Sequence, residues 1–454
     1  MHLILGFGVT GASFLRYLNK KNIPSLIMDS RESPPGLSEF KSLKKENLFF
    51  GEYNDDILDR IDTVLLSPGI DYENKFLSKA RSLNKEILTD IEVFLNESQS
   101  TKIIVTGTNG KTTAVSMIQH LLKGLFKEEK IVSCGNIGTP VLDTLNDKND
   151  ISIIETSSFH LEHIQTKNLK CEIAVLLNIE QDHLDRHKSF FEYRTIKEKV
   201  FSNCLIGIAD KRVLSPNISS KKNILTNFDK EFSVFSDHYA EEVSKRINKL
   251  HYPTKANISY VLAIVSALLL IRKEKKLENS LSLRSLSKDK YIKDLWLKSL
   301  DILASFKGLE HRFEVLGTSK EGINYINDSK STNIHSCLKA VSECEAIFGK
   351  NKTILICGGD SKNQDFSKIS REEVASIKKV LIYGKDKRKI IKNLISKADC
   401  SLVSNLEEAI KETNSISVSG DVVLLSPSCS STDMFLDYKE RGDRFRKLTG
   451  FNKK

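Results

Sequence analysis

Short apolar runs that end in small polar residues recur along this chain, and they constrain its fold more than any other feature. They are HLILG at 2–6, TVLLSPG at 63–69, KIIVTGTNG at 102–110, SIIETSS at 152–158, AVLLNIE at 174–180, TILICGGD at 353–360, KVLIYG at 379–384 and VVLLSPS at 422–428. Helical patterns follow them. Strands that alternate with helices predict parallel sheets and an α/β fold. In such sheets, ligands bind at the carboxyl ends of the strands.

The chain length and two polar stretches predict three domains. At roughly 150 residues per domain, 454 residues correspond to about three. NESQSTK at 96–102 reads as a linker, and FKGLEHRFE at 306–314 opens a further block. We therefore expect domains at 1–98, 99–307 and 308–454: a Rossmann-like N-terminal domain, a central domain with a mostly parallel sheet, and a Rossmann-like C-terminal domain.

The bulk composition favours a soluble cytoplasmic protein. The formal charge of +10 is spread along the chain without a dense basic block, which argues against nucleic acid as a partner. The eight cysteines form no C-x-x-C pair, so we expect free or buried thiols in a reducing compartment. MHLILGFGVTG lacks the basic start of a signal peptide, and the apolar run 260–271 is too short to span a membrane.

The stretch IVTGTNGKTTA at 104–114 is typical of a phosphate-binding loop. Gly110, Lys111 and Thr112 match the end of G-x-x-x-x-G-K-[ST], although Val105 stands where the first glycine is usual. An ordinary strand–turn–helix joint is the alternative. Lys111 would bind phosphate and Thr112 would offer its hydroxyl to Mg²⁺. The expected ATP-binding residues of this loop are Gly107, Thr108, Asn109, Gly110, Lys111, Thr112 and Thr113.

A second glycine motif, GFGVTG, opens the chain. Gly6, Gly8 and Gly11 fit G-x-G-x-x-G, and Asp29 ends the next strand. Such loops bind NAD, bind other nucleotides, or only pack tightly. Nothing downstream is typical of hydride transfer, so we favour a different diphosphate-bearing nucleotide, with Asp29 at its base or ribose.

Acidic residues and histidines follow two strands of the central block. Glu155 ends one strand and could reach a metal held by Thr112; a surface or capping role is the alternative. The cluster DHLDRH offers His183 as the best metal candidate, with its neighbours in structural or supporting roles: Asp182, Asp185 and His187. Lys197 and Lys199 lie on the next predicted helix, and nothing in their spacing singles one out.

The last block offers charged and hydroxyl groups at strand ends. Arg312 is a candidate phosphate clamp. Asp328 and Lys330 could bracket a transferring phosphoryl group. A carboxylate-bearing substrate would suit three further residues, although turn residues of these types are common: Lys362, Ser430 and Ser431.

Taken together, these motifs resemble the Mur ligases, the ATP-dependent amino-acid-adding enzymes of bacterial peptidoglycan synthesis. The resemblance covers nearly the whole chain and is weakest over about 205–300. It rests on GFGVTG, MDSRESPPGL, SPGI, DIEVF, GTNGKTT, GNIGTP, ETSSFHLE, LNIEQDHLDRH, GLEHRFE, NDSKSTN, GGDSK, LLSPSCSSTDMF and ERGDRF. In this family the short phosphate loop is the normal form.

The resemblance implies a reaction and its substrates. The first domain would bind the UDP moiety, the second ATP and two Mg²⁺ ions, and the third D-glutamate. The enzyme would join the L-alanyl carboxylate of UDP-N-acetylmuramoyl-L-alanine to the amine of D-glutamate through an acyl phosphate, as a monomer. Alternatives are another amino-acid ligase of this type, such as one similar to folylpolyglutamate synthetases, a nucleotide-dependent binding module, or an NAD-binding oxidoreductase.

The resemblance also implies site residues. Those around the UDP-linked substrate would be Val9, Thr10, Asp29, Ser30, Arg31, Asn136, Ser157 and His160. Lys111, Thr112 and Glu155 would hold ATP and the first metal, and His183 and a carbamylated Lys197 would serve the second. Arg312 and Asp328 would contact ATP. The reacting carboxyl group and D-glutamate would be surrounded by Lys330, Thr332, Lys362 and Ser431.

The chain departs from the family pattern in three places. Ala256 and Tyr260 stand where His and an adenine-reading Asn are frequent, and Tyr260 could stack on adenine instead. Asp437 and Tyr438 replace the expected Asn and Phe near the glutamate pocket, and His160 replaces a common Gln. None of these changes removes a residue that the chemistry requires.

Overall fold

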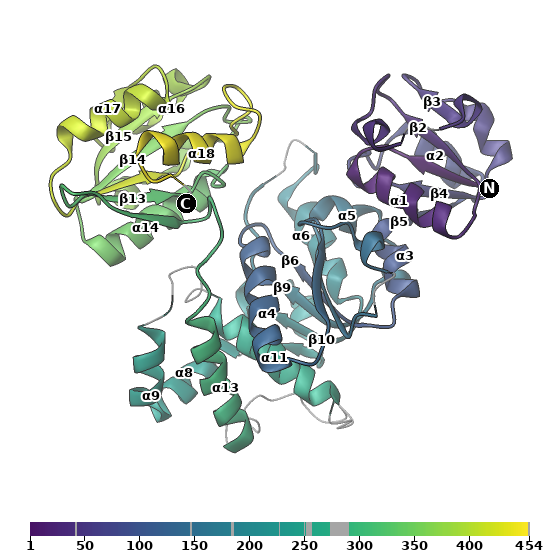
Figure 1. Ribbon diagram of the computed structural model, residues 1–454, viewed down its shortest axis with the longest axis horizontal. Coiled ribbons are helices and arrows are strands. Elements are labelled where there is room, and N and C mark those ends of the chain that lie inside the picture. Colours follow the sequence, from purple (N-terminus) through teal and green to yellow (C-terminus); the bar gives the residue numbers. More distant parts are fainter. Residues whose placement is uncertain are drawn as a thin grey trace. The chain divides into compact units, whose positions relative to one another are not determined.

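The computed structural model describes residues 1–40, 43–145, 148–182, 186–226, 228–248, 250, 257–272 and 290–452. The chain divides into two compact units, which we describe separately. The first comprises Met1–Leu250 and Thr254–Phe306, and the second is built on Lys307–Lys454 (Figure 1). The three predicted domain ranges stay a prediction, since a division into units by contacts does not set domain boundaries.

The first unit opens with a five-stranded parallel sheet. In spatial order its strands are β3 (Leu48–Phe50), β2 (Ser25–Asp29), β1 (His2–Leu5), β4 (Thr63–Leu66) and β5 (Glu86–Thr89). Its helices are α1 (Val9–Lys20) and α2 (Lys75–Ser82). The central strands are buried on both faces, which explains why they read as continuous apolar runs.

A six-stranded parallel sheet forms the rest of the first unit. In spatial order its strands are β11 (Ile224–Leu225), β10 (Asn203–Ala209), β9 (Lys170–Leu176), β6 (Thr101–Thr106), β8 (Ile151–Glu155) and β7 (Ile131–Gly135). Its helices are α3 (Asp90–Glu97), α4 (Lys111–Leu125), α5 (Ser158–His163), α6 (Phe190–Glu198), α7 (Pro216–Ser219), α8 (Phe228–His238), α9 (Ala240–Ile247), α11 (Ile258–Arg272) and α13 (Lys290–Leu303). The predicted buried helix over 260–271 is confirmed as α11, which packs on β9, β10 and α4.

The second unit holds a sheet that is parallel except at one edge. In spatial order its strands are β12 (Glu314–Thr318), β13 (Asn324–Asn327), β17 (Val422–Leu425), β14 (Thr353–Gly358), β15 (Ile377–Tyr383) and β16 (Cys400–Leu402). Only β12 pairs antiparallel with its neighbour within this sheet. Its helices are α14 (Ile334–Phe348), α15 (Arg371–Val374), α16 (Lys387–Leu394), α17 (Leu406–Ile416) and α18 (Tyr438–Leu448).

Alternate residues of the second unit's strands feed two hydrophobic cores. Leu355 and Cys357 of β14 belong to the core that includes residues of α14 and α16. Ile354 and Ile356 belong to the core that includes residues of α17 and α18. This two-residue period places helices on both faces of the sheet, as the α/β prediction requires.

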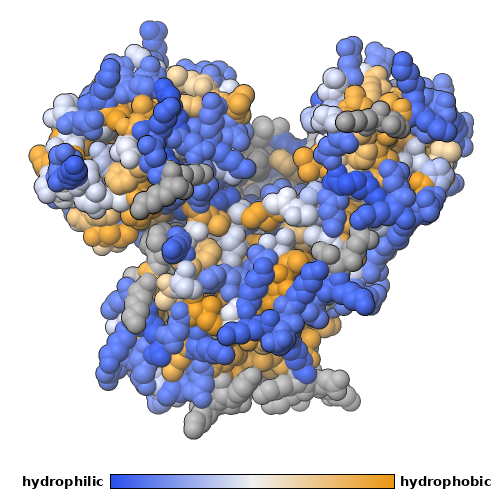
Figure 2. All heavy atoms as spheres, viewed as in Figure 1, coloured by the Kyte–Doolittle hydropathy of each residue, from blue (hydrophilic) through white to orange (hydrophobic). Residues whose placement is uncertain are grey.

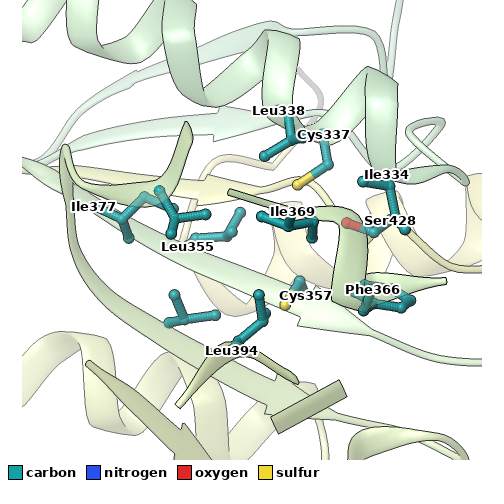
Figure 3. Close-up of a pocket in the computed structure, with 12 residues that line it drawn as sticks. Ile334, Cys337, Leu338, Leu355, Cys357, Phe366, Ile369, Ile377, Leu394 and Ser428 are labelled. Atoms are coloured by element: carbon teal, nitrogen blue, oxygen red, sulfur yellow. The ribbon is translucent and has the colours of Figure 1, made fainter. Parts of the chain in front are cut away.

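A small apolar cavity lies inside the core between α14 and the sheet (Figure 3). It measures about 20 Å³ and is lined mainly by aliphatic and cysteine side chains, among them Ile334, Cys337, Leu355 and Cys357. A cavity of this size holds at most about one water molecule. It is therefore a packing void and not a substrate site.

The surface and the thiols agree with the composition. Hydrophilic residues cover most of the face shown in Figure 2. In the described parts of the chain, no helix has both the length and the apolar character needed to cross a membrane. The eight cysteines are free thiols, six of them buried, as the absence of C-x-x-C pairs predicts.

Candidate functional site

The predicted phosphate loop is a short turn between β6 and α4. Val105 is a fully buried strand residue, so the loop begins only at Gly107 and has no place for the earlier glycine. Gly110 has φ +79° at the N-cap of α4, a left-handed conformation that glycine adopts without strain. The Lys111 ammonium donates to the carbonyls of Gly107 (2.8 Å) and Thr108 (2.9 Å). The loop thus holds a cation and a helix N-terminus where a phosphate would bind.

Asn178, two residues after β9, holds this loop in place by hydrogen bonds from the strand beside β6. Its Oδ1 accepts the Asn109 N–H (2.8 Å), its Nδ2 donates to the Asn109 carbonyl (3.0 Å), and its own carbonyl accepts the Thr108 N–H (3.0 Å). These paired bonds fix the middle of the loop. Sequence reasoning missed Asn178, because an Asn after a strand reads as an ordinary turn residue.

Lys197 of α6 lies beneath the same loop. Its side chain is about 1% exposed, and its ammonium donates to the Gly107 carbonyl (2.8 Å) and lies 4.8 Å from the centre of the Tyr193 ring. Burial and, to a lesser extent, the charge of Lys111 lower the pKa of Lys197 well below its usual value. By contrast, Lys199 donates to the carbonyls of Leu161 and Glu162. The structure therefore distinguishes Lys197 from Lys199, which their spacing in the sequence did not.

Glu155 ends β8, the strand beside β6. Its carboxylate is buried; Oε1 accepts a hydrogen bond from Asn136 Nδ2 (3.0 Å), and Oε2 has no hydrogen-bond partner within the described residues. A buried carboxylate oxygen without a donor is costly and suits a cation. Glu155 and Asn136, both predicted site residues, are thus brought together at the carboxyl edge of the sheet.

The structure supports the other metal-ligand candidates less well than Glu155. His183 and Asp185 lie outside the described residues. His187 is buried with Nε2 3.1 Å from Ser158 Oγ, in keeping with a structural role. No group of three His, Cys, Asp or Glu side chains is arranged to hold a metal in the part of the chain that the structure describes. Glu155 is therefore the described carboxylate that best fits a cation.

Ser157 and His160, expected at the muramoyl part, contact each other at the start of α5. Ser157 Oγ lies 2.6 Å from His160 Nδ1 and accepts the His160 N–H (3.3 Å). Burial lowers the pKa of His160 to about 4, so the imidazole is neutral near pH 7. This pair offers hydrogen bonds to a ligand and no charge.

In the N-terminal sheet, Asp29 is held by its own chain. The Phe7 N–H (2.7 Å) and the Arg31 guanidinium (2.6 and 2.8 Å) donate to its carboxylate. Burial raises the pKa of Asp29, but these donors outweigh it and the net pKa is lowered. Val9, Ser30 and Arg31 are exposed around this pair, and Thr10 is half-buried. The glycine loop and the end of β2 therefore present the predicted residues at one edge.

Asp328 and Lys330 follow β13 in the second unit. Asp328 accepts the Phe313 N–H (3.0 Å) and the Ser426 hydroxyl (2.9 Å), and burial raises its pKa to about 7. The Lys330 ammonium lies 4.1 Å from the centre of the Tyr438 ring. The backbone of Arg312 pairs with that of Leu309 in an isolated antiparallel β-bridge, in the turn before β12.

The residues expected at D-glutamate lie on loops at the strand ends of the second unit. Lys362 is exposed with φ +46° and donates its N–H to Asp360 Oδ1 (2.9 Å). Ser430 pairs with Asp360 in an isolated bridge, and Ser431 beside it is buried. The Thr332 carbonyl accepts a bond from Gln364 Nε2 (3.3 Å), which joins two of these loops.

Two of the departing positions have a structural account. Asp437 is the N-cap of α18 and accepts the N–H groups of Lys439 (2.8 Å) and Glu440 (2.9 Å). Asn and Asp are equally good N-caps, so this change keeps the role. The Tyr260 hydroxyl donates to the Leu177 carbonyl (2.7 Å), and its ring lies 4.6 Å from that of Phe228. Adenine stacking on Tyr260 stays a prediction.

Arg441 of α18 joins the loops after β13 and β17, and sequence reasoning missed it. Its fully buried guanidinium donates to Ser329 Oγ (3.0 Å), the Ser329 carbonyl (2.7 Å) and the Cys429 carbonyl (3.1 Å). The next residue, Gly442, packs so closely on His311 that a Cβ there would lie 2.2 Å from its ring. A glycine inside a charged helix was the available signal, because it costs about 1 kcal/mol relative to alanine and usually has a packing reason.

Three family models match the chain in order. They are the Mur ligase MurD-like N-terminal domain at residues 1–89, the Mur ligase middle domain at 105–260, and the Mur ligase glutamate ligase domain at 311–429. Together they cover the three sheets described above, apart from residues 101–104 of β6.

Curated relatives match over nearly full length. A UDP-N-acetylmuramoylalanine–D-glutamate ligase of Buchnera aphidicola is 34% identical and one of Coxiella burnetii is 32% identical, each over 98% of this chain and 97% of the relative. Among solved structures, a UDP-N-acetylmuramate-alanine ligase of Thermotoga maritima has a TM-score of 0.54 at 16% identity, covering 99% of both chains. The MurF ligase of Thermotoga maritima with ADP also has a TM-score of 0.54, covering 98% of this chain and 93% of that one.

Proposed function

Because this chain belongs to the Mur ligase family, we propose that it joins UDP-N-acetylmuramoyl-L-alanine to D-glutamate at the expense of ATP. Members of the family are ATP-dependent ligases that form amide bonds, and the chain is an enzyme of this type. The identity of its two other substrates is our inference from the relatives' name and from the site.

The observation that carries the proposal is the convergence of two lysines on one loop. The amines of Lys111 and Lys197 both lie 2.8 Å from the Gly107 carbonyl, and Glu155 ends an adjacent strand of the same sheet. Two ammonium ions on one oxygen would repel each other, and burial together with the charge of Lys111 lowers the pKa of Lys197 well below its usual value. An amine at the phosphate loop and a buried amine with a lowered pKa beside it suit different tasks.

The reaction would proceed in two steps. A substrate carboxylate oxygen attacks the γ-phosphorus of ATP, the bond to the bridging oxygen breaks, and an acyl phosphate and ADP form. The D-glutamate amine then attacks the acyl carbon, phosphate leaves, and the amine loses a proton. Lys111 and the N-terminus of α4 would offset the negative charge that gathers in the first step.

The donor set fits a divalent cation. Thr112, Glu155, His183 and Lys197 as a carbamate would hold Mg²⁺, which when bound would offset phosphate charge. In its neutral form, which the lowered pKa favours, the Lys197 amine can add to CO₂, forming an N–C bond and releasing a proton. Labelled bicarbonate should then give a carbamate carbon signal in NMR spectra that is lost in Lys197→Gln; its absence from active wild-type enzyme would remove this part of the proposal.

We place the nucleotide and substrate contacts as predicted. The N-terminal sheet would bind the UDP moiety through Asp29 and Arg31, with Asn136, Ser157 and His160 at the muramoyl part. Arg312 and Asp328 would contact ATP, and Lys330 would lie near the reacting carboxyl group. Thr332, Lys362 and Ser431 would contact D-glutamate. We further propose a cytoplasmic monomer.

One coupled assay tests the function. We expect phosphate release from ATP only when UDP-N-acetylmuramoyl-L-alanine and D-glutamate are both present. A panel of D-glutamate, L-alanine, L-lysine and diaminopimelate tests the amino acid. Preference for another amino acid would reassign the enzyme within the family, and ATP hydrolysis that needs no amino acid would favour a nucleotide-dependent binding module.

A further inference from the structure

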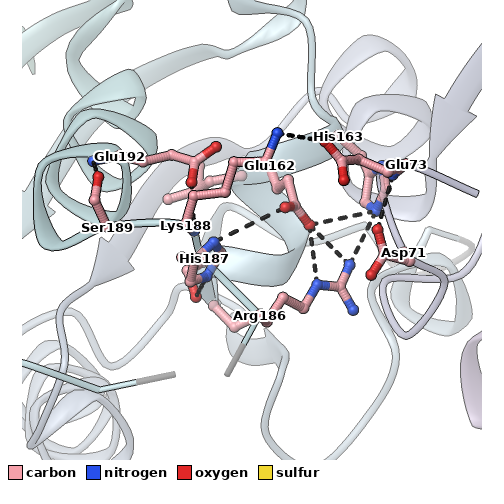
Figure 4. Close-up of polar contacts among 12 residues, drawn as sticks. Asp71, Glu73, Glu162, His163, Arg186, His187, Lys188, Ser189 and Glu192 are labelled. Carbon is pink, nitrogen blue, oxygen red and sulfur yellow. Dashed lines mark hydrogen bonds and ion pairs between the residues drawn. The ribbon is translucent and has the colours of Figure 1, made fainter. Parts of the chain in front are cut away.

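The loop after β4, residues 67–73, is held by side chains of α5 and of the segment between β9 and α6. Arg186, between β9 and α6, donates to the carbonyls of Gly69 (3.3 Å) and Ile70 (2.7 Å). His163 Nε2 lies 2.9 Å from the same Ile70 carbonyl, and its pKa is lowered to about 4 by burial, so it acts as a neutral donor. Glu162 accepts two bonds from Arg186 (2.7 and 3.2 Å) (Figure 4). We call Arg186, Glu162 and His163 the clasp.

The clasp is largely buried. The side chains of Arg186 and Glu162 are 14% and 12% exposed. The Arg186 guanidinium also lies 4.6 Å from the centre of the Phe159 ring. Breaking a buried, hydrogen-bonded charge leaves its partners unsatisfied, so this arrangement is costly to lose.

One end of the clasp reaches the glycine loop of the N-terminal sheet. The loop that Arg186 holds begins with Ser67, whose hydroxyl donates to the Gly6 carbonyl (2.7 Å). Both segments lie at the carboxyl ends of adjacent strands β1 and β4, where ligands bind in such sheets. A shift of Arg186 would therefore displace the expected UDP site.

The other end reaches the phosphate loop. Glu162 Oε1 lies 3.8 Å from His187 Nδ1, and the His187 ring lies 5.3 Å from that of Tyr193. The Tyr193 hydroxyl is 3.0 Å from Thr108 Oγ1 in the phosphate loop. In addition, Arg186 follows the expected metal residue His183 by three positions. Contiguous buried contacts thus run from Ile70 to Thr108.

From these contacts we propose that Arg186 is a positioning residue that couples binding of the UDP-linked substrate to binding of ATP. The inference rests on the proposed function. A ligand that orders the 67–73 loop would fix Arg186 and, through His187 and Tyr193, the phosphate loop, so the second ligand would bind a site already ordered.

The test is calorimetric titration of UDP-N-acetylmuramoyl-L-alanine with and without a non-hydrolysable ATP analogue and Mg²⁺. We expect the analogue to tighten binding by at least about 5-fold, the lower end of common coupling factors. Arg186→Met should bring this factor to about 1–2, whereas Lys188→Met should leave it unchanged. Lys188 is a matched control, because its ion pair with Glu73 spans the same two segments but is exposed.

A second variant guards against misfolding of Arg186→Met. Tyr193→Phe removes only the hydroxyl contact with Thr108 and should at least halve the coupling factor. Failure of the wild type to bind the UDP-linked ligand would overturn the proposed function itself. Two results would overturn the clasp inference alone. One is a wild-type enzyme that binds the UDP-linked ligand equally tightly with and without the ATP analogue. The other is a coupling factor that stays unchanged in both Arg186→Met and Tyr193→Phe.

Discussion

At the scale of single residues, Lys197 is where stability and function oppose each other. A buried amine whose pKa is lowered costs folding free energy, because the unfolded chain hydrates it and binds its proton more tightly. Lys197→Met should therefore raise the midpoint of thermal unfolding by a few degrees, corresponding to about 1–2 kcal/mol. The same change should lower ligase activity by about 100-fold or more, the usual effect of losing a preorganised electrostatic group.

Lys199→Met is the matched control for Lys197. Lys199 lies two positions later and donates to backbone carbonyls of α5. Its loss should leave activity within a few-fold of wild type and lower the unfolding temperature. If Lys197→Met instead kept activity while Lys199→Met lost it, the two lysines would have to exchange the roles assigned to them.

Asp328 should make the stability of the second unit depend on pH. Burial raises its pKa to about 7, whereas an unfolded aspartate titrates near about 4. Between these values the folded state binds the extra proton, so this group's contribution to stability falls as the pH rises from about 4 to 7. Asp328→Asn removes the titrating carboxyl group, and with it this loss of stability at higher pH. The unfolding temperature of Asp328→Asn minus that of the wild type, both followed by circular dichroism, should increase from pH 5 to pH 8. If this difference were the same at both pH values, it would contradict the raised pKa.

At the scale of elements, α18 holds two strand ends of the second unit in place. Arg441→Met would leave the carbonyls of Ser329 and Cys429 without their donors, at about 1–3 kcal/mol for each buried group. Lys330 and Ser431 lie two residues or fewer from these carbonyls. The KM for D-glutamate should therefore rise by about 10-fold or more, while binding of the UDP-linked substrate stays unchanged.

Arg444→Met on the same helix is the control for Arg441. Arg444 forms a largely exposed ion pair with Glu407, and such pairs contribute about 0–1 kcal/mol. Kinetic constants should not change in this variant. An Arg441→Met enzyme that loses stability but keeps its KM for D-glutamate would show that the helix supports the fold and not the site.

The elements also show what a sequence can and cannot predict. The strands were predictable because buried parallel strands are unbroken apolar runs, and the phosphate loop because its chemistry demands particular residue types at fixed spacing. The contacts of Asn178, Arg186 and Arg441 were not, although these residues stand within motifs of the family, since each resembles a common turn or surface residue. Their partners lie 69, 116 and 112 residues away in sequence, and only the fold brings them together.

At the scale of the whole molecule, the two units have separate cores, so we expect heat to unfold them in two steps. The single tryptophan, Trp296, is buried in the first unit, where its Nε1 donates to Ser266 Oγ (3.0 Å). Tryptophan fluorescence should therefore follow the first unit alone, whereas circular dichroism follows both.

Ligands and a core variant distinguish the two steps. UDP-N-acetylmuramoyl-L-alanine at about 100 times its Kd should stabilise the state that binds it by about 2.7 kcal/mol and raise the fluorescence midpoint by several degrees. Val380→Ala, in the core of the second unit, should lower only the midpoint temperature of the second unit's unfolding step, which fluorescence does not report. A fluorescence midpoint that falls in Val380→Ala, or that ignores the UDP-linked ligand, would mean that the units unfold together or that the ligand binds elsewhere.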